Sequence, residues 1–376
     1  MVLTPFVLPG ETVRVEVVSE KKNLVRAKAS EIVEASPHRR EPACPYFSQC
    51  GGCCYQHISY ERQLLLKESI LRETLLRAGK VAPPRIDVVA GERAGYRNRE
   101  QFHIAGGRIG FLRAGSHELQ PVMNCPIAAP AINDALAALR RMAHQPRFPA
   151  FLRTLELFTN GEQIQLNAAA AGGRRLARGF FDWCAKEMPG SDVSAIDYPA
   201  AAKVFRVGHR SFFQVNRFLV DRLVELALDG AGGETALDLY AGVGLFSLPL
   251  ADRVPRVTAV ETGRGAVDDL IFNAERAGLP VKAHRGAAGP FLSGFDEAPD
   301  FVLADPPRSG LGSGVTAHLI RLRPRRLNIV SCDPSTLARD LVELLGAGYR
   351  IEAMTLVDLF PETFHIETVT RLRFGD

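Results

Sequence analysis

The sequence lacks several features that would place it in other classes of protein. It has no apolar run of about 18 or more residues, so we expect no transmembrane helix. Its net charge of +4 is only mildly basic, which is compatible with nucleic acid but does not by itself indicate binding. It has no internal repeat, and Met1–Leu8 lacks the basic leader of a signal peptide. We therefore expect a cytoplasmic protein that is not associated with a membrane.

What the sequence does contain is typical of a globular protein with two or three domains. It has 376 residues, of which 46% are hydrophobic and 23% charged. Residues 1–43 alternate in the manner of a small β unit, and Ile58–Ala78 repeats apolar residues at helical spacing. A β-rich pattern follows over residues 96–170, with Asn160-Gly161 as a hairpin turn. From Phe205 the pattern becomes α/β.

The seven cysteines form the first candidate site. An odd number without a secretion signal favours a reducing compartment and a metal or catalytic use. Five residues separate Cys44 from Cys50 and two separate Cys50 from Cys53, and the intervening glycines let the backbone wrap tightly. Cys125, beside a proline, is the best candidate for a fourth ligand. Zinc and an iron–sulfur cluster both accept four thiolates, so spacing leaves both open, with a redox pair as a third option.

A glycine-containing turn in the α/β half indicates a cofactor site. Thr235–Leu248 reads as strand, turn and helix, with glycines at Gly242 and Gly244 but without the third glycine of a dinucleotide-binding loop. The next strand, Arg256–Glu261, ends in a carboxylate that suits the two hydroxyls of a ribose. Together they predict a nucleoside-containing cofactor; the alternative is a turn that serves packing alone.

A cysteine at a strand end is the candidate nucleophile. Leu327–Val330 reads as a buried strand, and Cys332 follows it at the carboxyl end, where open α/β sheets bind ligands. We expect Ser335 and Thr336 to cap a helix that runs on from Leu337. The N-terminus of that helix would lower the pKa of the thiol and increase its thiolate fraction. The alternative is an inert, buried cysteine.

Other charged residues are expected at the same edge of the sheet. Asp305 and Arg308 flank two prolines, whose stiff turn either presents them to a planar ligand or is simply a rigid loop. Glu367 opens the last strand, near the expected position of Cys332. A nucleophilic thiol and a carboxylate base beside a nucleoside cofactor are an arrangement typical of an active site. The run Tyr96–Arg99 is expected to contact phosphates or to end a solvated strand.

These residues carry a resemblance to a known family. The chain resembles the bacterial RNA uracil-C5 methyltransferases, which make 5-methyluridine in ribosomal or transfer RNA with S-adenosylmethionine. The motifs that carry the resemblance lie over nearly the whole chain: Cys44-x₅-Cys50-Gly-Gly-Cys53, Ser211-Phe-Phe-Gln214-Val-Asn216, Asp238-Leu-Tyr240-x-Gly242-x-Gly244, Asp305-Pro-Pro-Arg-x-Gly310, Ser331-Cys332-Asp333-Pro-x-Thr-Leu-Ala-Arg-Asp340 and Phe360-Pro-x-Thr-x-His365-x-Glu367.

The resemblance implies a cofactor, a cluster and a reaction. The residues that match the ligands of a 4Fe-4S cluster are Cys44, Cys50, Cys53 and Cys125. The residues that match contacts to S-adenosylmethionine are Gln214, Tyr240, Glu261 and Asp305. Cys332 matches the nucleophile, which would add to C6 of uracil and make C5 nucleophilic toward the methyl group, and Glu367 matches the general base, which would remove the C5 proton.

The resemblance also implies a fold. We expect a class I S-adenosylmethionine methyltransferase, a Rossmann-like doubly wound sheet, over residues 205–376. Residues 44–55 and 88–204 would form a β-rich central domain with the iron–sulfur cluster, and residues 56–87 a helix that packs on the catalytic domain. Residues 1–43 look like only part of a TRAM domain, a small OB-like barrel that grips RNA.

Three departures and three alternatives accompany this interpretation. Asp333 stands beside the thiol where the family has Asn, so we expect its carboxylate to point away; Leu245 and Glu362 replace a polar residue and a His. Ribosomal RNA is the expected substrate and partner, with no obligate protein partner. The alternatives are a transfer RNA enzyme, a non-catalytic RNA-binding assembly factor and an iron–sulfur redox protein, although the last would need a second redox group.

Overall fold

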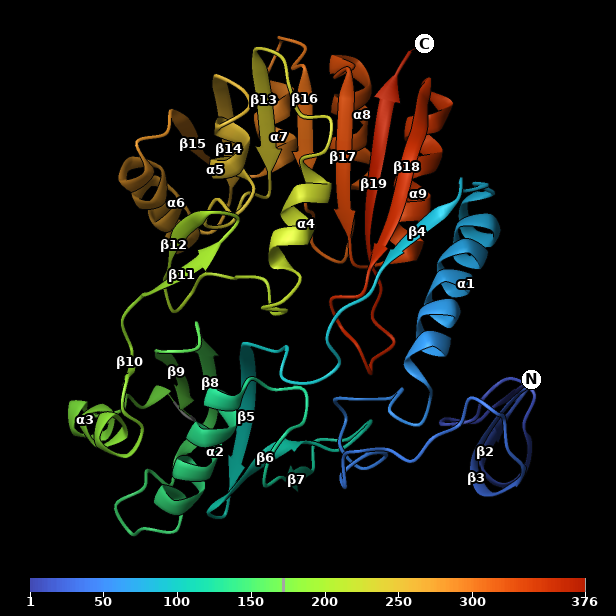
Figure 1. Ribbon diagram of the computed structural model, residues 1–376, viewed down its shortest axis with the longest axis vertical. Helices are drawn as coiled ribbons and strands as arrows, with labels where there is room; N and C mark the ends of the chain where they lie inside the picture. The colour runs from blue at the N-terminus through green and yellow to red at the C-terminus, as the bar shows by residue number, and fades with distance from the viewer. Residues whose placement is uncertain (171–172, 376) are drawn as a thin grey trace.

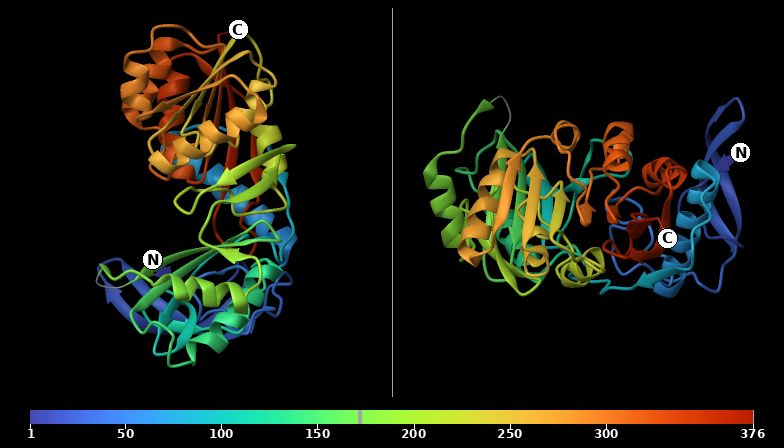
Figure 2. Two further views of the ribbon diagram at one scale, coloured as in Figure 1. Left: turned by 90° about the vertical axis from the view of Figure 1, so that its left-hand side faces the viewer. Right: turned by 90° about the horizontal axis from the view of Figure 1, so that it is seen from above.

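The computed structural model describes residues 1–170 and 173–375. Two lobes make up most of the molecule, and a small N-terminal unit lies beside the lower one (Figure 1). The C-terminal lobe surrounds an eight-stranded sheet, and the central lobe surrounds a six-stranded sheet. Figure 2 shows that the lobes are joined along one side and separate on the other. No helix among the described residues is long and apolar enough to cross a membrane.

The eight-stranded sheet confirms the doubly wound α/β pattern predicted from Phe205 onward. Its central strands are almost fully apolar, and every residue of Phe301–Ala304 is 0% exposed, as expected for a sheet covered on both faces. Seven strands run in the same direction, and the last strand of the chain, which lies between two of them, runs antiparallel to both neighbours. In spatial order the strands are β15 (Val281–Arg285), β14 (Arg256–Glu261), β13 (Thr235–Leu239), β16 (Phe301–Ala304), β17 (Arg326–Ser331), β19 (Glu367–Phe374), β18 (Tyr349–Val357) and β4 (Ile86–Val89).

Two sets of helices cover the faces of this sheet, each with its own apolar core. The first core contains residues of α4 (Val220–Ala227), α5 (Ser247–Ala251) and α6 (Arg264–Ala277). The second contains residues of α1 (Tyr60–Gly79), α7 (Ala288–Ser293), α8 (Gly312–Leu322) and α9 (Pro334–Gly346). The predicted helix Ile58–Ala78 is thus α1, displaced by one or two residues at its ends.

The C-terminal lobe includes a segment from early in the chain. Helix α1 packs against α9, and β4 pairs in parallel with β18, with Ile86 opposite Met354. The central lobe is therefore inserted between β4 and the rest of the α/β lobe. The short hairpin of β11 (Ile196–Ala200) and β12 (Lys203–Val207) returns the chain to this lobe, because its buried residues belong to the first core.

The central lobe is a mixed sheet backed by two helices. Its strands are β10 (Ser191–Asp192), β9 (Ile164–Ala170), β8 (Leu152–Thr159), β5 (Arg99–Ala105), β6 (Arg108–Leu112) and β7 (Leu119–Pro121), and its helices are α2 (Pro130–Ala143) and α3 (Arg178–Glu187). The predicted Asn160-Gly161 turn joins β8 to β9, and the Asn160 side chain accepts from the backbone N–H groups of Glu162 and Gln163. Neither expectation for Tyr96 and Asn98 is correct, because both are 0% exposed.

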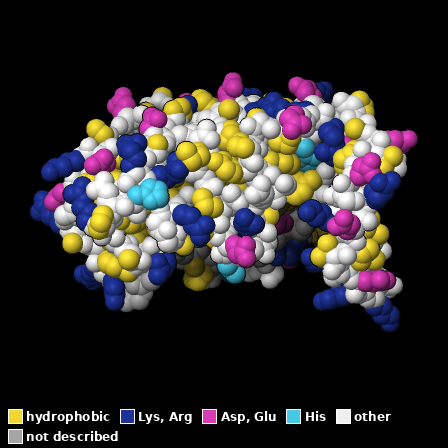
Figure 3. Space-filling view, turned by 90° about the horizontal axis from the view of Figure 1, so that it is seen from below, with side chains coloured by type: hydrophobic (Ala, Val, Ile, Leu, Met, Phe, Trp, Pro, Cys, Tyr) yellow, Lys and Arg dark blue, Asp and Glu magenta, His cyan; other side chains and the backbone are white. Residues whose placement is uncertain are grey.

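The N-terminal unit is a three-stranded sheet that adds little to the core. Its strands are β1 (Val2–Leu3), β3 (Leu24–Glu34) and β2 (Thr12–Lys21), and most of their side chains are exposed. Glu11 anchors the unit through Arg39, whose Nε and Nη2 lie 2.5 and 2.6 Å from its carboxylate. A groove of about 980 Å³ separates the unit from the central lobe. In the view from below, the unit projects beside the rest of the molecule (Figure 3).

Candidate active site

A cavity of about 890 Å³ lies at the carboxyl edge of the eight-stranded sheet and brings the predicted residues together. Its wall contains all of the expected cofactor and catalytic residues: Gln214, Tyr240, Glu261, Asp305, Cys332 and Glu367. The topology explains this convergence, because parallel strands end at one edge and the antiparallel β19 begins there. In Figure 1 the ends of β13, β16 and β17 point toward the central lobe, so this edge faces the junction of the lobes.

The turn after β13 is shaped to receive a ligand against the backbone. Tyr240 adopts a left-handed φ of +66°, and the N–H groups of Tyr240 and Ala241 both donate to the Val260 carbonyl. Gly244 has a φ of +91°, and a Cβ there would lie 2.8 Å from a methyl of Leu248. A side chain at Gly244 would therefore be strained and would clash. Gly242 of the same turn lines the cavity and has no atom within 4 Å of the place that a Cβ would take, so a cofactor can approach the backbone there.

Glu261 is oriented by this same turn. Its Oε2 accepts from the N–H of Gly242 at 3.0 Å, and its Oε1 accepts from the N–H of Gly263 at 2.6 Å. Thr262 Oγ1 also donates to Oε1 at 3.2 Å. A carboxylate has about four acceptor positions, so Oε2, which accepts only one of these hydrogen bonds, can still accept from a hydroxyl of a ribose. The backbone thus fixes the direction in which Glu261 meets a ligand.

Gln214 is positioned by tertiary contacts that its own motif does not reveal. Gln214 is 7% exposed, and its carbonyl accepts from Asn98 Nδ2 at 2.9 Å. The preceding turn is held by Asp269 on α6, which accepts from the N–H of Gly208 at 2.7 Å and from Ser211 Oγ at 2.6 Å. Asp269 therefore ties the loop that carries Gln214 to the α/β lobe.

The environment of Cys332 corrects two predictions. Asp333 is the N-cap of α9, in place of Ser335 or Thr336, because its carboxylate accepts from the backbone N–H groups of both residues at 2.8 and 3.1 Å. The helix N-terminus is thus engaged by the carboxylate of Asp333. Burial and the negative charge of Glu367 raise the pKa of Cys332, so the predicted lowering by the helix is wrong.

Two carboxylates of the cavity favour their protonated forms. Burial raises the pKa of Asp305 to about 7. Burial and the charge of Asp305 also raise the pKa of Glu367 well above its ordinary value, while Arg308 acts in the opposite direction. Burial and Arg308 lower the pKa of His365 to about 4, so this imidazole is neutral at pH 7 and its Nδ1 accepts from Arg308 at 3.2 Å. The raised pKa of Glu367 makes its carboxylate, once ionised, a stronger base toward a proton on carbon.

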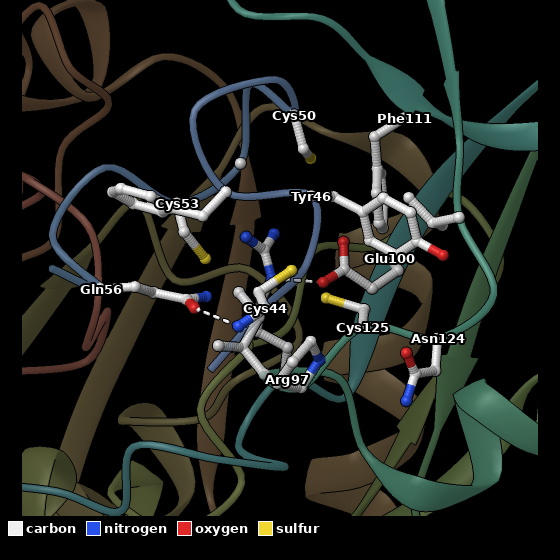
Figure 4. Close-up of a pocket in the computed structure, with 15 residues that line it drawn as sticks. Cys44, Tyr46, Cys50, Cys53, Gln56, Arg97, Glu100, Phe111, Asn124 and Cys125 are labelled. Carbon is white, nitrogen blue, oxygen red and sulfur yellow. Dashed lines mark hydrogen bonds and ion pairs between the residues drawn. The ribbon is translucent and has the colours of Figure 1, made fainter. Parts of the chain in front are cut away.

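The four cysteines of the predicted cluster line a second, smaller cavity of about 60 Å³ (Figure 4). Its donor set of four thiols, Cys44, Cys50, Cys53 and Cys125, fits an iron–sulfur cluster chemically. Burial raises the pKa of all four, to about 12 for Cys53. Within residues 1–170 and 173–375, no group of three or more His, Cys, Asp or Glu is arranged to hold a single metal ion. Ligands of a multinuclear cluster are spread more widely than those of one ion.

Three further residues line these cavities: Glu100 and Phe212, which were not predicted as site residues, and Arg97, which was expected to contact phosphates or to end a solvated strand. Arg97 lines both cavities, and its Nε lies 3.1 Å from Oε1 of Glu100, a carboxylate that lines the cysteine cavity. Phe212 lines the larger cavity and is 62% exposed, which leaves its ring available to stack on a base. Only tertiary contacts reveal Glu100 and the position of Arg97 in both cavities, whereas Phe212 lies in a quoted motif.

Comparisons with known proteins agree with this geometry. The model of the family described as tRNA (Uracil-5-)-methyltransferase matches residues 198–288 and 292–373. A 23S rRNA (uracil(1939)-C(5))-methyltransferase of Halomonas elongata is 32% identical over 410 residues, which span 98% of this chain and 84% of that protein. An uncharacterised RNA methyltransferase of Aquifex aeolicus is 30% identical over 405 residues, covering 100% and 94% of the two chains.

A solved structure extends the likeness to the whole fold. The crystal structure of the Pyrococcus abyssi tRNA (uracil-54, C5)-methyltransferase with S-adenosyl-L-homocysteine superposes with a TM-score of 0.80. It is 26% identical in sequence, and the match covers 99% of this chain and 95% of the other. The chain therefore belongs to the RNA uracil-C5 methyltransferase family and is an S-adenosylmethionine-dependent enzyme with the class I fold.

Proposed function

We propose that the enzyme methylates C5 of uracil in RNA through a covalent adduct between Cys332 and C6. The observation that carries this proposal is the shared cavity. Cys332, Glu367 and the residues assigned to the cofactor all line one cavity of about 890 Å³. A methyl transfer to a heteroatom would need neither a thiol nor a buried carboxylate at this place.

The chemistry assigns a role to each of the two reacting side chains. Uracil C5 is a weak nucleophile. Addition of the Cys332 thiolate at C6 produces an enolate, in which C5 is nucleophilic. S-Adenosylmethionine supplies the electrophilic methyl group. Glu367 then removes the C5 proton, and the C6–Sγ bond breaks to release Cys332. The target base must leave its stack to reach the cavity, at a cost of a few kcal/mol.

We assign the cofactor contacts to the residues at the strand ends. The carboxylate of Glu261 would bind the ribose hydroxyls, since two backbone N–H groups already orient it. The residues that would complete the site are Gln214, Tyr240 and Asp305, all of which line the same cavity.

Ribosomal RNA is the substrate that we propose. Two relatives named as 23S rRNA uracil methyltransferases, from Halomonas elongata and Alkalilimnicola ehrlichii, are 32% and 33% identical to the chain. Transfer RNA is the second candidate, since the Pyrococcus abyssi enzyme acts on tRNA by its name and matches nearly the full chain.

We further propose a division of labour along the chain. Residues 205–376, with the helix of residues 56–87, perform the methyl transfer, and residues 1–43 contact RNA as a shortened TRAM-like unit. Residues 44–55 and 88–204 form the central domain, apart from the hairpin strand β11, which packs on the α/β lobe. In this domain Cys44, Cys50, Cys53 and Cys125 would hold a 4Fe-4S cluster. The cluster has a structural role in this proposal, and no step of the reaction passes through it. All seven cysteines are free, which agrees with the reducing cytoplasm.

Covalent trapping tests the proposal. Anaerobically purified enzyme is mixed with S-adenosylmethionine and 5-fluorouridine-substituted fragments of ribosomal or transfer RNA, and the products are separated on a denaturing gel. Fluorine at C5 cannot be removed as a proton, so the adduct should persist. A slow band that is absent from Cys332→Ala would establish the mechanism, and the RNA that yields it is the substrate. If no RNA yields a band with protein that binds the cofactor, the covalent mechanism is wrong.

A further inference from the structure

The segment just before Glu367, the proposed general base, is hydrogen-bonded at consecutive residues by groups from other parts of the chain. This segment, Asp358–Ile366, joins β18 to β19 and is here called the base loop; Glu367 follows it directly. Four successive carbonyls of the base loop accept hydrogen bonds from groups that lie elsewhere in the chain. The pairs are Leu359 with Asn216 Nδ2 at 2.9 Å, Phe360 with Lys67 Nζ at 2.9 Å, Pro361 with Tyr96 OH at 3.0 Å, and Glu362 with the N–H groups of Cys54 and Tyr55, both at 3.0 Å.

Glu362 is the most heavily bonded residue of this loop. Its side chain is buried, and its carboxylate accepts from Arg40 Nη2 at 2.7 Å, Arg93 Nε at 2.7 Å and Gln63 Nε2 at 2.9 Å. Its backbone N–H donates to Gln63 Oε1 at 3.0 Å. Glu362 also has a left-handed φ of +67°, a conformation that is strained for a residue with a Cβ. Such a conformation persists only where the surroundings impose it.

The partners of Glu362 belong to the segment that carries the cysteines. Cys54 and Tyr55 directly follow Cys53, which lines the cysteine cavity. Gln63 also donates to the Tyr55 carbonyl at 3.1 Å, so one amide contacts both the cysteine segment and the base loop. The order of the cysteine segment is therefore transmitted to the base loop through Glu362.

We propose that Glu362 is a positioning residue for proton abstraction, because it fixes the base loop against the cysteine segment and thereby sets the place of the Glu367 carboxylate. This inference rests on the proposed covalent mechanism. In the affected step, Glu367 takes the proton from C5, the C–H electron pair forms the C5–C6 double bond, the C6–Sγ bond breaks, and Cys332 leaves as a thiolate. Addition and methyl transfer come earlier and do not use Glu367. A displaced Glu367 therefore leaves methylated RNA attached to Cys332.

The test uses RNA with ordinary uridine, on which the wild-type enzyme completes the reaction. We expect Glu362→Ala to accumulate a covalent RNA–protein band on a denaturing gel, with kcat lowered at least about tenfold and KM for S-adenosylmethionine changed less than about twofold. The band should be absent from the double variant that also carries Cys332→Ala. The matched control is Glu352→Ala on β18, since Glu352 also pairs with two arginines, Arg326 at 3.1 Å and Arg373 at 3.5 Å, but lies outside the base loop. It should behave as the wild type.

Each outcome separates this inference from the proposed function. A folded Glu362→Ala enzyme that is slow but gives no band with ordinary uridine would overturn the positioning role, while a wild-type band with 5-fluorouridine would leave the function intact. If Glu362→Ala does not fold, Glu362→Gln decides, since it keeps an acceptor oxygen but loses the charge that faces Arg40 and Arg93. If Glu362→Gln gives a covalent band with ordinary uridine, the inference is supported. If it reacts at the wild-type rate without a band, the inference is refuted.

Discussion

The buried ion pair between Lys67 and Asp358 leads to a quantitative prediction about stability. Lys67 Nζ lies 2.5 Å from Asp358 Oδ1, and both side chains are 0% exposed. Removing one partner of a buried pair leaves an uncompensated charge and costs about 3–5 kcal/mol. In Lys67→Met, Tyr60 still donates to Asp358 at 2.9 Å, so the lower end of the range applies. For a lobe of this size, about 3 kcal/mol corresponds to a melting temperature lowered by roughly 6–12 °C.

A double variant tests the reasoning. In Lys67→Met/Asp358→Asn no charge is buried, and the amide oxygen still accepts from Tyr60, so we expect most of the lost stability to return. The Phe360 carbonyl keeps a donor in Thr363 Oγ1 at 2.8 Å. Calorimetry of the wild type, the two single variants and the double variant gives the coupling energy between Lys67 and Asp358. Lys203→Met serves as a surface control, because its partner Asp252 is 48% exposed; its stability should stay within about 1 kcal/mol of the wild type. A single variant that melts like the wild type, or a double that melts no higher than the single, would refute the argument.

Three further predictions concern the active site. Asp269→Asn removes a charged acceptor from the loop that carries Gln214, so KM for S-adenosylmethionine should rise about tenfold, as steady-state kinetics would show; an unchanged KM contradicts this positioning. Glu261→Ala should weaken S-adenosylmethionine binding about tenfold or more in calorimetry, because charged hydrogen bonds contribute about 1.5–3 kcal/mol, and unchanged affinity would remove Glu261 from the site. Because the pKa values of Cys332 and Glu367 are both raised and both groups act as anions, kcat/KM for RNA should increase with pH through the neutral range; a rate that falls over this range would argue against these roles.

Much of the active site was predictable because its residues occupy positions that a local pattern reveals. Glu261, Asp305 and Cys332 each lie at or just after the end of an apolar strand, and parallel strands of one sheet end together. Placement in one cavity follows from that topology alone. Their chemical roles remain predictions.

The contacts that hold the site in place could not be predicted from local patterns. Lys67 and Asp358 are 291 positions apart in the sequence, and Gln63 and Glu362 are 299 apart. A buried lysine on a helix of mixed polarity is indistinguishable in sequence from a solvated one. The prediction of the N-cap of α9 was wrong for a different reason. Aspartate, serine and threonine are all good N-cap residues, and only the backbone path decides between Asp333, Ser335 and Thr336.

The pairing of β4 with β18 has a consequence for how the chain is made. β4 ends at Val89, and its partner begins at Tyr349, roughly 260 residues later. At about 5–20 residues per second, a ribosome needs on the order of 13–52 s to supply that partner. During this interval the central lobe can fold, while α1 and β4 wait with their apolar faces uncovered. Synthesis from a gene truncated before β18 should therefore yield a chain that chaperones retain, even though its central lobe is complete.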